Sequence, residues 1–207
     1  MAAIITEKFR VHNARQFKED FGEPESSTYV FIGRSYSWAD DNSPPAPANG
    51  VGEEIQAWED MLALKKVDPA DVSHGINRYN WTSGTTYDEY SHDYSATNKT
   101  PATNKDSLYE GRFYVLTDEY HVYKCIRTGR DSSGAVVGSV NKPTGTDVLT
   151  LFEGTATDEG GTDGMPYLWK YMYTISASDT IKFVTNDFIP VKTLGALNGI
   201  YGTHTNG

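Results

Sequence analysis

The chain has 207 residues, enough for one large domain or two small ones, and its 14 Tyr, 8 Phe and 4 Trp supply apolar surface for a buried core. Its formal net charge is −10, and Lys and Arg form no basic run, which excludes a nucleic-acid backbone as the expected partner. The single cysteine, Cys125, excludes an internal disulfide and a cysteine-based zinc site.

The sequence shows no targeting signal. The first residues, MAAIITEKFR, lack the basic start and the long apolar run of a signal peptide. No stretch approaches the ~20 apolar residues of a membrane-spanning helix. We therefore expect a soluble protein made in a reducing compartment, with no membrane partner and with Cys125 as a small core residue of a strand.

The N-terminal part predicts short elements. Residues 3–9 alternate as a first strand would, and residues 14–21 predict a helix with Phe17 and Phe21 one turn apart. The β-branched and aromatic run at 28–33 predicts a fully buried strand.

A surface loop and a second helix follow. The loop, residues 39–52, is rich in Asp, Asn, Pro and Gly. Residues 53–66 predict a helix with acidic residues in its first turn and lysines in its last. Its apolar stripe consists of Ile55, Trp58, Met61 and Leu62. Asp68 and Pro69 predict the capped start of a further short turn.

The segment 75–101 is polar, aromatic and rich in turn formers, which predicts an ordered loop. Its rings either pack on their own domain or contribute to a protein interface, where Tyr and Trp are enriched. Together with Trp38, which stands just before the loop at 39–52, the candidate interface residues are Tyr79, Trp81, Tyr87 and Tyr90.

The C-terminal part predicts strands. Residues 109–127 read as a hairpin, and residues 148–152 as a short strand or an extended connection. Residues 167–175 alternate with a period of two, so one aromatic face is expected. That face would carry Tyr167, Trp169, Tyr171, Tyr173 and Ile175. The tail, residues 195–207, is rich in Gly, Asn and Thr and predicts no regular structure.

Together these elements predict a mainly β fold. Strand candidates outnumber helices, and no strand–helix–strand alternation occurs, which favours an antiparallel, layered β-sandwich. Two helices, near 14–21 and 53–66, would be inserted in long loops. The expected body spans residues 1–194, followed by the tail at 195–207.

Two acidic segments offer oxygen ligands for a metal ion. In the first, residues 158–164, Gly160 and Thr162 occupy positions where an EF-hand needs ligands, so only a looser calcium loop remains open. The second contains Asp88, Glu89, His92 and Asp93 without any helical zinc spacing, and a solvated acidic loop is the favoured interpretation.

No catalytic motif is present. The chain has no Walker loop, no dinucleotide-binding fingerprint and no nucleophile elbow. The sequence therefore predicts no catalytic, cofactor-binding or metal-binding residue. Paired carboxylates for glycoside cleavage stay open, because their separation is a property of the folded chain.

Four blocks of sequence resemble the baseplate wedge proteins of contractile-tailed phages, the gene-eight product family. The blocks keep their order over most of the chain. They are residues 4–9 with Phe17; residues 28–35 with Trp38 and the proline-rich loop; residues 58–69 with Arg78 and Trp81; and residues 122–126 with 163–164, 169–173 and 186–191.

The resemblance implies a structural virion protein of the tail baseplate, assembled in the host cytoplasm, with a β-sandwich body and helices in its loops. It implies a homodimer that contacts other wedge proteins and rearranges when the sheath contracts. No cofactor and no catalytic residue come with it. Family members continue with further strands, so this chain corresponds to a fragment, a short member or the ordered part of a longer chain.

Two other functions remain open from the sequence. One is a carbohydrate-binding β-sandwich that uses Tyr and Trp rings, Trp81 among them, as stacking platforms, with room for a calcium ion near Asp158 or Asp163. The other is a glycoside hydrolase or lyase with its acids in the loop at 88–93.

Overall fold

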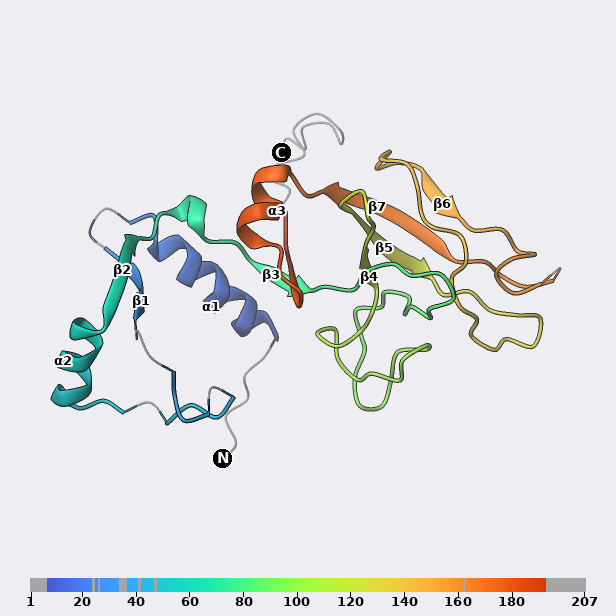
Figure 1. Cartoon of the computed structure of the whole chain (residues 1–207). Coiled ribbons are helices and arrows are strands. Elements are labelled where there is room, and N and C mark those ends of the chain that lie inside the picture. Colours follow the sequence, from blue (N-terminus) through green and yellow to red (C-terminus); the bar gives the residue numbers. More distant parts are fainter. Residues whose placement is uncertain are drawn as a thin grey trace, which may run out of the picture. The chain divides into compact units, whose positions relative to one another are not determined.

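The computed structural model describes residues 7–23, 25, 27–33, 37–40, 42–46, 48–161 and 163–192 (Figure 1). The chain divides into two compact units, Met1–Ser73 and His74–Gly207. The expectations for residues 3–6 and for the tail at 195–207 lie outside the described residues. Within the described part, no helix has the length and apolar character needed to cross a membrane.

The described residues of unit 1 form two helices, a two-stranded sheet and a short 3-10 turn. Its elements are α1 (Glu7–Asp20), β1 (Tyr29–Gly33), α2 (Val51–Glu59), β2 (Met61–Lys66) and η1 (Pro69–Asp71). β1 and β2 pair antiparallel, with Phe31 opposite Leu64 and Ile32 opposite Ala63. The short turn confirms the expected cap, since Asp68 is its N-cap and Pro69 opens it.

The first helix begins earlier than expected. α1 starts at Glu7, so the strand predicted for residues 3–9 is wrong at residues 7–9. Glu, Lys, Arg, Gln and Ala dominate α1, and neither Gly nor Pro interrupts it, so helix propensity prevails over a short alternation. Phe17 and Phe21 lie edge to face with ring centroids 5.1 Å apart, as their spacing predicts.

The helix predicted for residues 53–66 is wrong in its second half. α2 ends at Glu59, and residues 61–66 form β2. The reason lies in the pairing, because a lone β1 would leave its backbone N–H and C=O groups without partners, and β2 supplies them. The burial predicted for the strand at 28–33 is also wrong, since all five residues of β1 are exposed.

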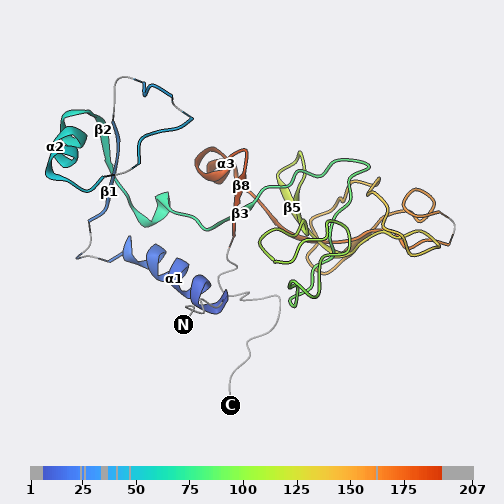
Figure 2. The same ribbon diagram turned by 90° about the horizontal axis from the view of Figure 1, so that it is seen from below.

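Unit 2 holds most of the strands. Its elements are β3 (Gly75–Asn77), β4 (Tyr114–Leu116), β5 (His121–Arg127), β6 (Leu151–Glu153), β7 (Leu168–Thr174), α3 (Ala177–Phe183) and β8 (Phe188–Pro190). A four-stranded sheet has the order β4-β5-β7-β6, and β3 pairs with β8. All of these strand pairs are antiparallel. Figures 1 and 2 show α3 beside β8, which it contacts. These features confirm the mainly β, antiparallel fold class with inserted helices.

The expected long strand forms as β7, but its aromatic residues do not share one face. The register between β5 and β7 shifts between Val122 and Tyr123, where the ladder contains a bulge or irregularity. Such a shift reverses the side-chain alternation beyond it. Tyr171 accordingly packs against one core cluster and Tyr173 against another.

Two clusters of buried side chains make the core, and both lie in unit 2. The first core cluster is Tyr87, Phe113, Val115, Tyr123, Cys125, Tyr167 and Trp169. The second core cluster is Leu116, Val122, Ile175 and Ile189. Cys125 is fully buried, as its strand-like neighbours predict.

The second core cluster makes stability sensitive to alkaline pH. Burial raises the pKa of Tyr173 to about 12, and its hydroxyl donates to the carbonyl of Pro190 at 2.7 Å. A folded pKa above the ordinary value of 10.0 gives stability that is complete below about pH 10 and is lost as the pH rises toward about 12. At about pH 11.5 this loss is about 2 kcal/mol.

We expect Tyr173→Phe to cost about 1 kcal/mol near neutral pH through the lost hydrogen bond, and to flatten the alkaline fall in stability. Urea unfolding at about pH 8.5 and about pH 11.5 measures both effects. Tyr109→Phe is the control, because Tyr109 is 68 % exposed. Equal alkaline losses in wild type and Tyr173→Phe would contradict the expectation.

Candidate functional site

The five interface candidates lie in different environments. Trp38 in unit 1 and Tyr90 in unit 2 are exposed, at 41 % and 38 %. Tyr79 and Trp81 are half-buried. Tyr87 lies inside the first core cluster and is 1 % exposed, so intramolecular packing accounts for this ring.

Tyr87 shapes the segment that carries Trp81. The Tyr87 hydroxyl accepts the N–H of Thr82 at 2.7 Å and donates to the carbonyl of Asn80 at 3.1 Å. The Trp81 N–H donates to the carbonyl of Leu116 at 2.8 Å, which ties the same segment to the end of β4. The core therefore fixes the backbone on both sides of Trp81.

The acidic loop at 88–93 uses its first carboxylate internally. Asp88 is fully buried and accepts the N–H groups of Ala102 at 3.0 Å, Thr103 at 2.9 Å and Arg112 at 2.9 Å, together with the Thr103 hydroxyl at 2.6 Å. Glu89 accepts the Thr128 N–H at 3.3 Å. Asp88 is thus occupied in joining three loop segments.

Glu159 has the same role in the other acidic segment. Its fully buried carboxylate accepts the Ser139 hydroxyl at 3.0 Å and three backbone N–H groups, those of Val140 at 2.6 Å, Asn141 at 2.8 Å and Tyr167 at 2.9 Å. A Cβ at Gly154 would lie 2.0 Å from this carboxylate, so the close approach requires glycine. Within the described residues, no group of three or more His, Cys, Asp or Glu side chains is placed to hold a metal ion.

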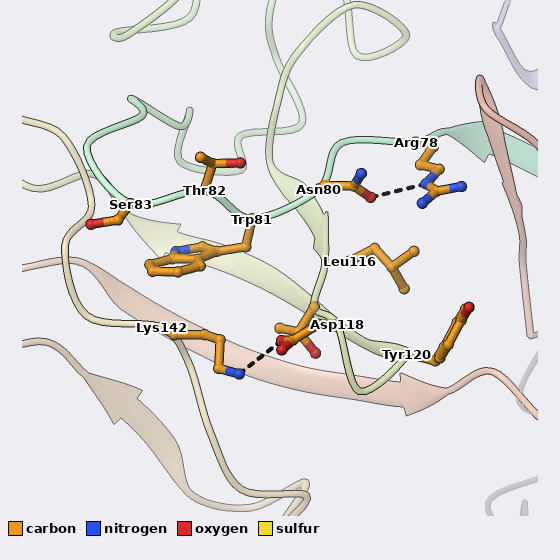
Figure 3. Close-up of a pocket in the computed structure, with 10 residues that line it drawn as sticks. Arg78, Asn80, Trp81, Thr82, Ser83, Leu116, Asp118, Tyr120 and Lys142 are labelled. Carbon is orange, nitrogen blue, oxygen red and sulfur yellow. Dashed lines mark hydrogen bonds and ion pairs between the residues drawn. The ribbon is translucent and has the colours of Figure 1, made fainter.

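A cleft of about 590 Å³ lies beside Trp81 in unit 2, and we call it the Trp81 cleft (Figure 3). The segment after β3 and the turn between β4 and β5 line the cleft, together with the side chain of Lys142. Its lining residues are Arg78, Asn80, Trp81, Thr82, Ser83, Leu116, Thr117, Asp118, Tyr120 and Lys142.

The polar side chains of the Trp81 cleft are held in place. Arg78 donates from Nε to Asn80 at 2.9 Å and from a terminal nitrogen to the carbonyl of Thr185 at 2.8 Å. The Trp81 indole N–H donates to the Ser139 hydroxyl at 3.2 Å. In Figure 3, Arg78 and Tyr120 are separated from the Trp81 ring across the cleft.

Lys142 forms an ion-paired group at the same cleft. Its ammonium lies 2.7 Å from Asp118 and also pairs with Glu119. Hydrogen bonding to Lys142 lowers the pKa of both carboxyls, and the two carboxylates raise the pKa of Lys142. One ammonium faces two carboxylates, so the group keeps one net negative charge.

Tyr120 has an unusual backbone conformation. It closes the turn between β4 and β5 with φ 60, and its N–H donates to the carbonyl of Thr117 at 3.0 Å. A tyrosine in the left-handed region costs about 1 kcal/mol relative to glycine, the usual residue there. Tyr120 is 42 % exposed, so packing in the core does not explain why a tyrosine occupies this position.

Trp38 lies at a separate pocket in unit 1. The pocket has a volume of about 520 Å³ and is lined by Phe31, Gly33, Trp38, Pro45, Glu53, Gln56, Ala57 and Asp60. It lies between β1 and α2, whose apolar side chains are exposed on either side of it.

The sequence indicated Trp81 and the acidic segments but not the Trp81 cleft. Arg78, Asp118, Tyr120 and Lys142 meet only in the folded chain, and of the four only Arg78 falls in a block that carries the family resemblance. Glu159 was missed because its four donors come from two separate places in the sequence, residues 139–141 and Tyr167. The one available signal was an acidic residue in a glycine-rich loop, and solvated acids have the same pattern.

Comparison with protein-family models identifies a family. The model for the phage Gp8 family, described as bacteriophage T4 Gp8, matches residues 3–197 of the 207. A search of curated proteins found no match. Since the match covers almost the whole chain, the chain belongs to the Gp8 family of phage tail baseplate wedge proteins, structural components of the virion.

Proposed function

We propose that the chain is a non-catalytic subunit of the baseplate wedge that dimerises, binds neighbouring wedge proteins and rearranges when the sheath contracts. Its family membership supports the structural role. The observation that carries the assembly role is the apolar surface of unit 1. The carbohydrate-binding alternative is not favoured, because the family is one of baseplate wedge proteins.

Unit 1 leaves its apolar side chains exposed. No described residue before residue 74 is buried, whereas unit 2 has two core clusters. The exposed large apolar residues of unit 1 are Phe9, Val11, Phe17, Tyr29, Val30, Phe31, Ile32, Trp38, Val51, Ile55, Trp58, Leu62 and Leu64. An apolar set of this size on a soluble protein marks an interaction surface.

Both faces of the β1–β2 sheet contribute to this surface. Phe31 and Leu64 are directly paired and lie on one face, and Val30 and Ile32 alternate with Phe31 on the other. All four are at least 45 % exposed. A two-stranded sheet is marginal by itself, and packing against a partner would provide the missing stability.

Of the sequence candidates, Trp38 and Tyr90 fit an interface role best, because both rings are exposed and that of Tyr90 is held in place. The Tyr90 ring lies edge to face with Phe113, at 5.2 Å between centroids. The Lys124 ammonium lies over the Tyr90 ring, 3.3 Å from its centroid. Rigid aromatic rings contribute contact area at low entropic cost.

Self-association of the full chain tests the proposal. We expect the combined substitution Ile32→Thr and Leu64→Thr to weaken association about tenfold or more, since it removes apolar contacts from both sheet faces and keeps strand-compatible residues. Sedimentation velocity over a concentration series measures the dissociation constant.

The matched control is Val140→Thr with Leu149→Thr, because these residues are also exposed but lie in unit 2. Circular dichroism checks that all variants fold. A chain that stays monomeric at high concentration and binds no other tail protein would contradict the proposal.

A further inference from the structure

Arg78 differs from Lys142, the other cationic residue that lines the Trp81 cleft. Among the described residues, no carboxylate lies within ion-pair distance of its guanidinium. Lys142, by contrast, is ion-paired with both Asp118 and Glu119. Arg78 is instead held by two neutral acceptors, the side chain of Asn80 and the carbonyl of Thr185.

This arrangement orients a positive charge in a chain whose formal net charge is −10. Two of the five guanidinium N–H donors are used by neutral acceptors, which leaves others for a ligand at the cleft. A planar, fixed guanidinium is suited to bind a carboxylate through two parallel hydrogen bonds. A guanidinium that no described carboxylate contacts therefore points to an anionic ligand.

Tyr120 provides a second, independent observation. Its exposed ring lines the same cleft from a backbone conformation that disfavours tyrosine. Residues kept in such conformations are concentrated at functional sites, where a required side chain outweighs the strain. The strain shows that the ring is retained at some expense in stability.

The remaining lining favours a peptide as the occupant. The half-buried Trp81 ring is fixed by Ser139, and the neighbouring Thr82 and Ser83 are exposed. The cleft volume of about 590 Å³ is in the usual range for pockets that bind small ligands, and it accommodates a few residues of an extended chain. Because the chain is a baseplate component, the available partners are other proteins.

We propose that the Trp81 cleft binds an extended segment of a neighbouring baseplate protein, with an Asp or Glu carboxylate of that segment on Arg78 and an apolar side chain between Trp81 and Tyr120. This inference rests on the proposed assembly role and names one contact that serves it. The site belongs to unit 2, whereas the apolar surface belongs to unit 1.

Photo-crosslinking in assembled tails tests the proposal. Benzoylphenylalanine replaces Ser83, which is exposed at the rim of the cleft, in the full chain supplied during phage infection. Baseplates are purified, irradiated and digested, and the crosslinked peptide is identified by mass spectrometry. We expect a segment of another baseplate protein that contains Asp or Glu.

Three variants measure the contributions to this contact. Arg78→Gln should reduce the crosslink yield at least tenfold, whereas Lys99→Gln, which alters an exposed cation outside the cleft, should leave it unchanged. Tyr120→Gly should also lower the yield, yet raise the urea midpoint of the isolated chain because it removes the backbone strain. This variant keeps the test valid if Arg78→Gln does not fold.

The two proposals fail in different ways. If the chain is present in baseplates but crosslinks to a segment without Asp or Glu, to a second copy of itself or to nothing, the cleft proposal is overturned and the assembly role stands. Unchanged yields in Arg78→Gln and Tyr120→Gly overturn it equally. Absence of the chain from purified baseplates overturns both.

Discussion

Replacing Glu159 with glutamine is expected to lower the free energy of unfolding of unit 2 by about 3 kcal/mol. The carboxylate accepts four hydrogen bonds, three at one oxygen and one at the other. The glutamine amide offers one oxygen and one NH₂ group. In either orientation the NH₂ group faces at least one buried backbone N–H, which is left without an acceptor.

Two effects oppose each other in this substitution. A neutral side chain is easier to bury than a carboxylate, which favours glutamine. Glutamine, however, replaces charge-assisted hydrogen bonds by weaker ones and leaves a donor unsatisfied. Each hydrogen bond to a charged group contributes about 1.5–3 kcal/mol, which favours the native glutamate. With four donors already in place, the second effect prevails.

Urea unfolding followed by tryptophan fluorescence measures the change, since Trp169 lies in the first core cluster. Asp163→Asn is the control, because Asp163 is exposed in the same part of the chain and should change stability by less than about 0.5 kcal/mol. A stability of Glu159→Gln equal to that of wild type would show that the buried carboxylate is not required.

Asp88→Asn is expected to destabilise unit 2 by about 2–3 kcal/mol for the same reason. Oδ1 of Asp88 accepts two backbone N–H groups, and Oδ2 accepts one N–H and the Thr103 hydroxyl, which can also act as an acceptor. The NH₂ group of asparagine therefore faces at least one backbone N–H in either orientation. Asp88 joins its own loop to the loop at 100–103 and to Arg112. The substitution would weaken the hydrogen bonds that hold these three segments together. Because Tyr90 lies two residues from Asp88, its exposed ring would lose its fixed position.

Hydrogen exchange of the Ala102, Thr103 and Arg112 amides locates this effect, and urea unfolding gives its size. Asp106→Asn provides the comparison, as Asp106 is exposed in the same loop region. Amide exchange that is unchanged in Asp88→Asn would refute the anchoring role. It would also reopen Asp88 as a free acid, which the hydrolase alternative requires.

Local patterns predicted elements well where neighbours in sequence decide the structure. The alternation within residues 109–127 and 167–175 gave the β4–β5 hairpin and β7, because a period of two suits only a pleated strand. The α3 helix was not predicted, although Ser176 and Asp179 carry its cap signal: the Ser176 hydroxyl accepts the Asp179 N–H at 3.1 Å.

Elements whose structure depends on a distant partner were predicted poorly. The stripe at residues 53–66 fits a helix, yet pairing with β1 makes its second half a strand. The register shift in β7 arises from its pairing with β5, so the alternation of residues along β7 alone does not reveal it. In each case the interaction that decides the structure lies far away in the sequence.

By itself, the sequence determined the mainly β class, the burial of Cys125, the acidic charge and the resemblance to the wedge family, since composition, alternation and ordered blocks are properties of the chain before it folds. Only the tertiary structure decided that Tyr87 belongs to the core, that Asp88 and Glu159 anchor loops, and that Arg78, Trp81 and Tyr120 share a cleft. The physical reason is that burial and hydrogen-bond partnership depend on residues brought together by folding, as with Glu159 and its donors at Ser139 and Tyr167.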